Sequence, residues 1–124
     1  MAKPIKHIHK LKLPMYNCTV HFIITDSLDF VVNSVYKKFK LNREVIGEAE
    51  GMVLSADILD YYLVIDLNYL SYNTISHELH HVVIKMTEDR GITDQETQAW
   101  IAGHLAGTLY QFLEKKNLTV KHGG

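Results

Sequence analysis

Residues 77–81 form the stretch HELHH, which is followed at once by the apolar run VVI. This stretch constrains the fold because ionisable side chains are costly to bury without partners. On an α-helix, His77 and His81 are four residues apart, so their rings project from one face, a single turn apart. The sequence therefore predicts a helix with one apolar face and a histidine pair that either faces water or binds a ligand.

The composition is that of an ordinary globular chain and predicts a single domain over residues 1–124, with loose tails at about 1–14 and 117–124. The formal net charge of −1 argues against a nucleic-acid partner. Cys18 is the only cysteine, which excludes disulfide scaffolds within one chain and favours a reducing compartment. We recognise neither a signal peptide nor a membrane span, so a cytoplasmic location is expected.

The element pattern predicts an α+β fold with a small, largely antiparallel sheet in the order β-α-β-β-α-α. Residues 16–25 alternate as a strand with one buried face, and the helix that Asp26 caps follows. Residues 50–56 and 61–67 are β-rich and are expected to pair as a hairpin through a polar turn at Asp57 and Asp60. A helix carrying the HELHH stretch ends near Arg90, where Gly91 stops it, and a last helix begins at Thr93 or Asp94.

The histidine pair matches the H-E-x-x-H pattern, in which two imidazoles reach one Zn²⁺. Glu78 projects roughly 100° away from them, beside the metal, where it can act as general base. His80 lies on another azimuth and is expected to be a surface or outer histidine. A polar helix start with two histidines that fall four residues apart by chance is the alternative.

A catalytic zinc usually takes three protein ligands, and Glu96 is the candidate for the third. It shares a face of the last helix with a small-residue stripe that lets the histidine helix approach closely: Ala99, Gly103 and Gly107. Glu96 can instead close a capping box with Thr93, in which case it never meets the metal. His104 is a further candidate ligand on a more polar face, and Glu88 lies about two turns below the pair, out of reach.

Several aromatic residues near these helices are candidates for contacts with a substrate. Tyr69 and Tyr72 precede the motif and can offer a hydroxyl to a developing oxyanion. Trp100 and Tyr110 can line a cleft. Packing into the core is the favoured explanation for each of them.

The strand YLVIDLN, the helix TISHELHHVV and the later ETQAWIAGHL resemble short, gluzincin-like zincin metallopeptidases, in particular the ImmA/IrrE group and small peptidase-like proteins of phages and mobile elements. The resemblance covers about residues 50–113. It implies that His77, His81 and Glu96 bind zinc and that Glu78 is catalytic. His80 stands where a small residue, often glycine, is common.

These observations predict a zinc-dependent metallopeptidase that hydrolyses a peptide bond of a protein or peptide substrate, which pairs with the strand at 51–55 or at 61–67. The alternative is a non-catalytic phage or mobile-element structural or adaptor protein that keeps the same fold. Phage encoding, with association to the virion, is the alternative to a purely cytoplasmic location. The substrate and the oligomeric state are open.

Overall fold

A computed structural model describes residues 3–39, 50–55 and 57–122. Two strands open the chain and two follow a helix, so the order is β-β-α-β-β-α-α. The strands are β1 (Lys6–Leu13), β2 (Cys18–Thr25), β3 (Gly51–Ser55) and β4 (Asp60–Asp66), and the helices are α1 (Leu28–Lys38), α2 (Tyr72–Asp89) and α3 (Gln95–Lys115). Short 3-10 turns occupy Pro14–Tyr16 and Leu67–Tyr69.

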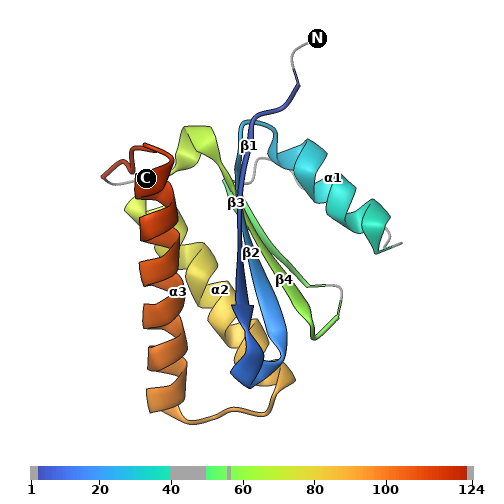
Figure 1. The fold of residues 1–124 in the computed structure, drawn as a ribbon, viewed down its shortest axis with the longest axis vertical. Helices are drawn as coiled ribbons and strands as arrows, with labels where there is room; N and C mark the ends of the chain where they lie inside the picture. The colour runs from blue at the N-terminus through green and yellow to red at the C-terminus, as the bar shows by residue number, and fades with distance from the viewer. Residues whose placement is uncertain (1–2, 40–49, 56, 123–124) are drawn as a thin grey trace.

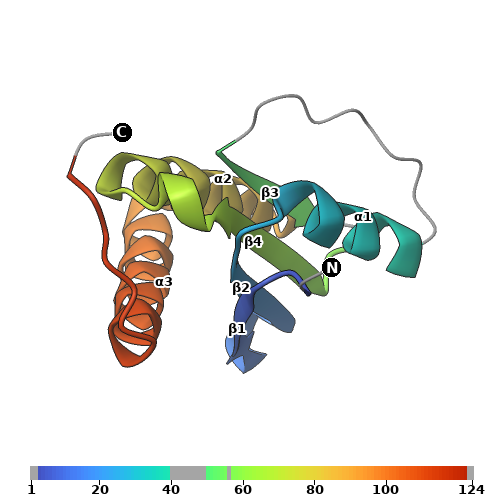
Figure 2. The same cartoon turned by 90° about the horizontal axis from the view of Figure 1, so that it is seen from above.

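The four strands form one mixed sheet in the order β1-β2-β4-β3, in which only the β2–β4 pairing is parallel. Helix α1 covers one face, and α2 and α3 cover the other, so that Figures 1 and 2 show three layers. A buried cluster fills each interface, the larger one on the α2–α3 side. The predicted α+β class with a small, largely antiparallel sheet is therefore confirmed.

The N-terminal segment is not the loose tail expected for about residues 1–14, because Lys6–Leu13 pair along their whole length with β2. Lysines alternate with histidines and leucines there, and the inward side is partly aromatic. The His9 ring stacks 5.5 Å from the ring of Phe112 and 6.4 Å from that of Phe22. A hydropathy pattern does not register the stacking of histidine on aromatic rings, so the sequence pattern does not predict β1.

The C-terminal tail expected at 117–124 is also partly ordered, up to the last described residue, 122. Lys121 forms a parallel bridge with Ser71, and its backbone exchanges hydrogen bonds with Leu70 and Tyr72. This segment fixes the chain just before α2 begins. None of the helices in the described part of the chain combines the length and hydropathy that a membrane crossing needs.

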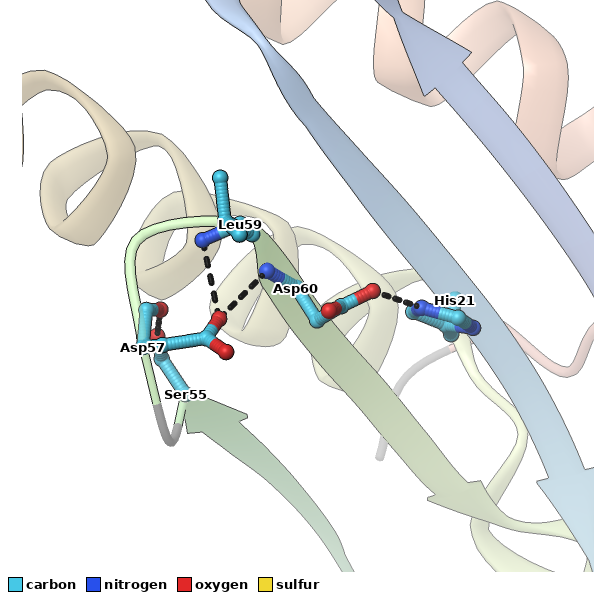
Figure 3. Close-up of polar contacts among 5 residues, drawn as sticks. All are labelled: His21, Ser55, Asp57, Leu59 and Asp60. Carbon is cyan, nitrogen blue, oxygen red and sulfur yellow. Dashed lines mark hydrogen bonds and ion pairs between the residues drawn. The ribbon is translucent and has the colours of Figure 1, made fainter. Parts of the chain in front are cut away.

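Strand β2 is buried on both faces, not on one as its alternation predicts, because α1 packs on the second face. His21 is 7% exposed there and stacks on Tyr62 at 4.2 Å between ring centroids. Its Nε2 lies 2.8 Å from Asp60 Oδ1 (Figure 3). Because Asp60 satisfies the imidazole nitrogen, burying this histidine costs less free energy than burying it without a partner.

The predicted hairpin is confirmed, with β3 and β4 antiparallel and Gly51 opposite Ile65. Its turn is held by Asp57, whose Oδ1 accepts hydrogen bonds of 2.9 Å from the amides of Leu59 and Asp60 (Figure 3). Such a carboxylate-to-amide turn orders the chain between two strands. Position 56 lies outside the described residues.

Arg90, at the C-terminal end of α2, ties three parts of the chain together. Its guanidinium donates to the carbonyl of Tyr16 at 2.8 Å and to the hydroxyl of Tyr61 at 2.7 Å. The Tyr61 hydroxyl in turn donates to Asp89 Oδ2. Gly91 then takes φ +65° and ends the helix as predicted.

This cluster predicts a loss of stability at alkaline pH. Tyr61 is fully buried, and burial, followed by its hydrogen bond to Asp89, raises its pKa from 10.0 to about 12. Between those values the native state keeps a proton that the unfolded state has released, so the free energy of unfolding falls by about 1.4 kcal/mol per pH unit as pH rises.

Urea unfolding of the parent and of Tyr61→Phe between pH 9 and 12 tests this expectation. The variant lacks the ionisable group and should show a flatter pH profile, although it starts less stable because Arg90 and Asp89 lose a partner. Identical slopes for the two proteins would show that Tyr61 does not control the alkaline transition.

Candidate functional site

Helix α2 presents the HELHH stretch in its second and third turns. Ser71 caps the helix, its Oγ accepting a 3.1 Å hydrogen bond from the amide of Thr74. One face is buried against the sheet and α3 through Ile75, Leu79, Val82, Val83 and Met86. The opposite face is exposed and carries His77, His80 and His81. The predicted amphipathic helix is therefore present.

The rings of His77 and His81 converge. Their Nε2 atoms lie 3.2 Å apart, and the rings meet at 79° with centroids 4.7 Å apart. Two nitrogens bound to one tetrahedral zinc at 2.0–2.1 Å are separated by about 3.3 Å. The same spacing suits a hydrogen bond from a protonated ring nitrogen to an unprotonated one. The distance between the two Nε2 atoms is therefore compatible with one shared Zn²⁺, and a direct hydrogen bond explains the same distance without metal.

The surroundings of His81 favour the neutral imidazole, which is the form that binds metal. Partial burial lowers its pKa from 6.5, and the positive charges of His77, His80 and Lys85 lower it further. Its lone pair is thus available at neutral pH. His80 is exposed, as predicted.

Glu78 lies on the other side of the same turn and is 6% exposed. Its Oε1 is 3.8 Å from His77 Nε2, too far for a hydrogen bond and close enough for an ion pair. Burial raises the pKa of the Glu78 carboxyl above 4.5, and the nearby His77 opposes that rise. A carboxylate beside the histidine pair, with a raised pKa, accepts a proton more readily than an exposed carboxylate does.

Edge strand β3 approaches Glu78 closely. A Cβ atom on Gly51 would lie 3.0 Å from Glu78 Cγ and 3.1 Å from the carbonyl oxygen of Val64, so one of these neighbours would have to shift by a few tenths of an ångström. A glycine at the start of β3 therefore lets the strand lie close to Glu78.

A cavity of about 250 Å³ opens between β3 and the first turns of α2. Its lining consists of Glu50, Gly51, Asn73, Thr74, His77 and Glu78. The Thr74 hydroxyl donates a 3.0 Å hydrogen bond to Glu50 Oε2. Sequence reasoning missed Glu50, whose only local signal is that it precedes the first glycine of the predicted strand.

The structure does not bring Glu96 to the histidine pair. In the described part of the chain, no three histidine, cysteine, aspartate or glutamate side chains are grouped closely enough to hold a metal ion. Glu96 is exposed in the first turn of α3, which begins beside the far end of α2 (Figure 1). About 12 Å of helix separates His81 from that end.

The small-residue stripe does not pack on α2, which is a correction to the sequence analysis. A Cβ added at Gly103 or Gly107 would meet nothing within 4 Å, and Ala99 is exposed. The packing face of α3 is formed instead by Ile101, Leu105, Leu109, Phe112 and Leu113. Burying these larger side chains removes more apolar surface from water than burying glycines does.

The capping-box alternative for Glu96 is also wrong. Asp94, not Thr93, caps α3, and its Oδ2 accepts from the amide of Thr97 at 3.0 Å and from the hydroxyl of Thr97 at 2.6 Å. His104 is exposed and stacks on Trp100 with 5.2 Å between ring centroids. Trp100 is itself 53% exposed, so it is not core.

Tyr72 and Tyr110, the candidate substrate contacts, lie together at the start of α2. Their ring centroids are 5.9 Å apart, and the ring of His122 lies 5.2 Å from that of Tyr72. Burial, then the neighbouring Tyr72, raises the pKa of Tyr110 above 10.0. The Tyr110 hydroxyl is therefore a neutral donor at neutral pH. Tyr69 is half-exposed in the turn before α2.

No family model, curated protein or solved structure matches this chain. The resemblance to the ImmA/IrrE group therefore stays a prediction from three short motifs. Any functional conclusion depends on the geometry of α2, β3 and the cavity between them.

Proposed function

We propose that this protein is a zinc-dependent metallopeptidase with His77 and His81 as metal ligands and Glu78 as general base. The observation that carries the proposal is the 3.2 Å approach of the two Nε2 atoms, with the buried Glu78 carboxylate 3.8 Å from one of them. The spacing matches two ligands of one tetrahedral ion.

When bound there, Zn²⁺ would act as a Lewis acid toward a peptide carbonyl and lower the pKa of water. Glu78 takes a proton from the attacking water and delivers it to the leaving amine. The raised pKa of its carboxyl favours both transfers, because a stronger base at neutral pH becomes an adequate acid one step later.

The substrate is proposed to be an extended peptide paired with β3. This strand is at the edge of the sheet, whereas β4 lies between β2 and β3 and has no edge to offer. Of the two strands considered from the sequence, only β3 can therefore add a partner strand. Gly51 places that edge directly beside Glu78.

Elemental analysis of protein purified without added metal, paired with cleavage of a peptide library, tests this proposal. We expect about one zinc per chain and cleavage that stops on chelation. Zinc without cleavage would favour the adaptor alternative, which the ungrouped Glu96 also favours, since a catalytic site usually has three protein ligands. Neither zinc nor cleavage would reject the metallopeptidase.

A further inference from the structure

The cavity beside Glu78 has a second carboxylate that a chain of hydrogen bonds holds in place. Ser71 Oγ donates to Thr74 Oγ1 at 3.1 Å, and Thr74 Oγ1 donates to Glu50 Oε2 at 3.0 Å. Both hydroxyl residues are buried, at 3% and 4% exposure. The backbone of Glu50 is fixed as well, its carbonyl accepting a 2.9 Å bond from the amide of Asp66. Glu50 is therefore positioned, although its own side chain reaches solvent.

The cavity has acidic groups on two sides and lacks a permanent cation in its lining. Glu50 and Glu78 are its carboxylates, and the remaining described lining residues include neither lysine nor arginine. Glu78 is more than nine-tenths buried and lines this space, and its ion-pair partner among the described residues is His77, whose Nε2 lies 3.8 Å from Glu78 Oε1. Burying a carboxylate with so little compensation is costly, which favours a cation in the cavity.

Ser71, not Glu50, is the N-cap of α2. The amide that an N-cap satisfies here, that of Thr74, already bonds to Ser71 Oγ. Glu50 instead accepts from a side-chain hydroxyl, which leaves its charge directed toward the cavity. Glu50 is also attracted by the positive end of the helix dipole at the start of α2. That attraction does not require a cavity beside the carboxylate.

We propose that this cavity binds a cationic group of the substrate, an ammonium or guanidinium, and that Glu50 determines this specificity. The inference rests on the proposed peptidase function, because it names the substrate class of that site. A volume of about 250 Å³ admits a lysine or arginine side chain or an amino terminus. Thr74 lies about one helical turn, or about 5.4 Å, before Glu78. An extended peptide rises about 3.3 Å per residue, so a cation held near Thr74 lies within about two residues of the scissile bond.

Binding in EDTA tests the inference without turnover. The probes are blocked alanine hexapeptides with one lysine at each position in turn, the same peptides with norleucine instead, and the norleucine set with an unblocked amino terminus. We expect the best lysine or unblocked peptide to bind about tenfold more tightly than its neutral counterpart, as a charge-assisted hydrogen bond provides. A preference for the lysine peptides would show that the cavity binds a side chain. A preference for the unblocked peptides would show that it binds an amino terminus.

Glu50→Gln should abolish this preference and Glu50→Lys should reverse it toward peptides with glutamate at the same position. Glu88→Gln, which removes an exposed carboxylate further along α2, should retain it. Equal affinities for charged and neutral peptides, or an unchanged preference in Glu50→Gln, would overturn the inference. Hydrolysis of the same peptides by zinc-loaded parent protein is scored separately: its absence would reject the peptidase and leave the cation preference standing.

Discussion

Glu78→Gln is expected to lower peptide hydrolysis by at least about 100-fold while keeping zinc and the fold, because the amide has no basic oxygen to accept the proton. The side chain is nearly isosteric and is not placed as a ligand, with Oε1 3.8 Å from His77 Nε2. Zinc content, thermal unfolding and cleavage of a fluorogenic peptide, measured on one preparation, separate these effects.

Glu88→Gln is the matched control for that experiment, since it makes the same chemical change on an exposed face of α2. It should cleave like the parent protein. Full activity in Glu78→Gln would remove Glu78 as general base. Loss of zinc in that variant would instead indicate that Glu78 coordinates the metal directly.

Zinc affinity should collapse in His77→Ala and in His81→Ala. Each substitution removes one of two nitrogens that lie 3.2 Å apart, so the loss should exceed the roughly 10–100-fold that follows loss of a group supporting a metal ligand. Competitive titration with a chelating dye measures it. Tight binding of one equivalent by either variant would show that the pair is a hydrogen-bonded couple and not a metal site.

The same titration decides the role of Glu96. It is exposed at the start of α3 and belongs to no metal-binding group among the described residues, so Glu96→Ala should keep nearly the parent's zinc affinity. Asp94→Ala should lower the stability of the protein, because α3 loses its cap, and should also keep the metal. A loss in Glu96→Ala as large as in the histidine variants would make Glu96 the third ligand, which requires α3 to turn that face toward α2.

Local patterns in the sequence determined much of the fold. Alternation and helical spacing correctly placed the β3–β4 hairpin, α2 with its apolar face, and α3, whose cap was narrowed to Thr93 or Asp94. These features depend on residues within a few positions of one another. The convergence of His77 and His81 belongs to the same class, since one turn of helix suffices to create it.

Only the tertiary structure decided which of two available faces is buried and which distant segments meet. Helix α3 has a small-residue face and a leucine-rich face. The leucine-rich face is the buried one, because its burial removes more apolar surface from water. Strand β1 is held in place because it pairs with β2 and because the ring of His9 stacks on that of Phe112. Glu50 and Thr74 are 24 positions apart in the chain and meet because β3 lies beside α2. No local periodicity of the sequence predicts that contact. Local spacing thus determined the histidine pair, and long-range packing determined the cavity next to it.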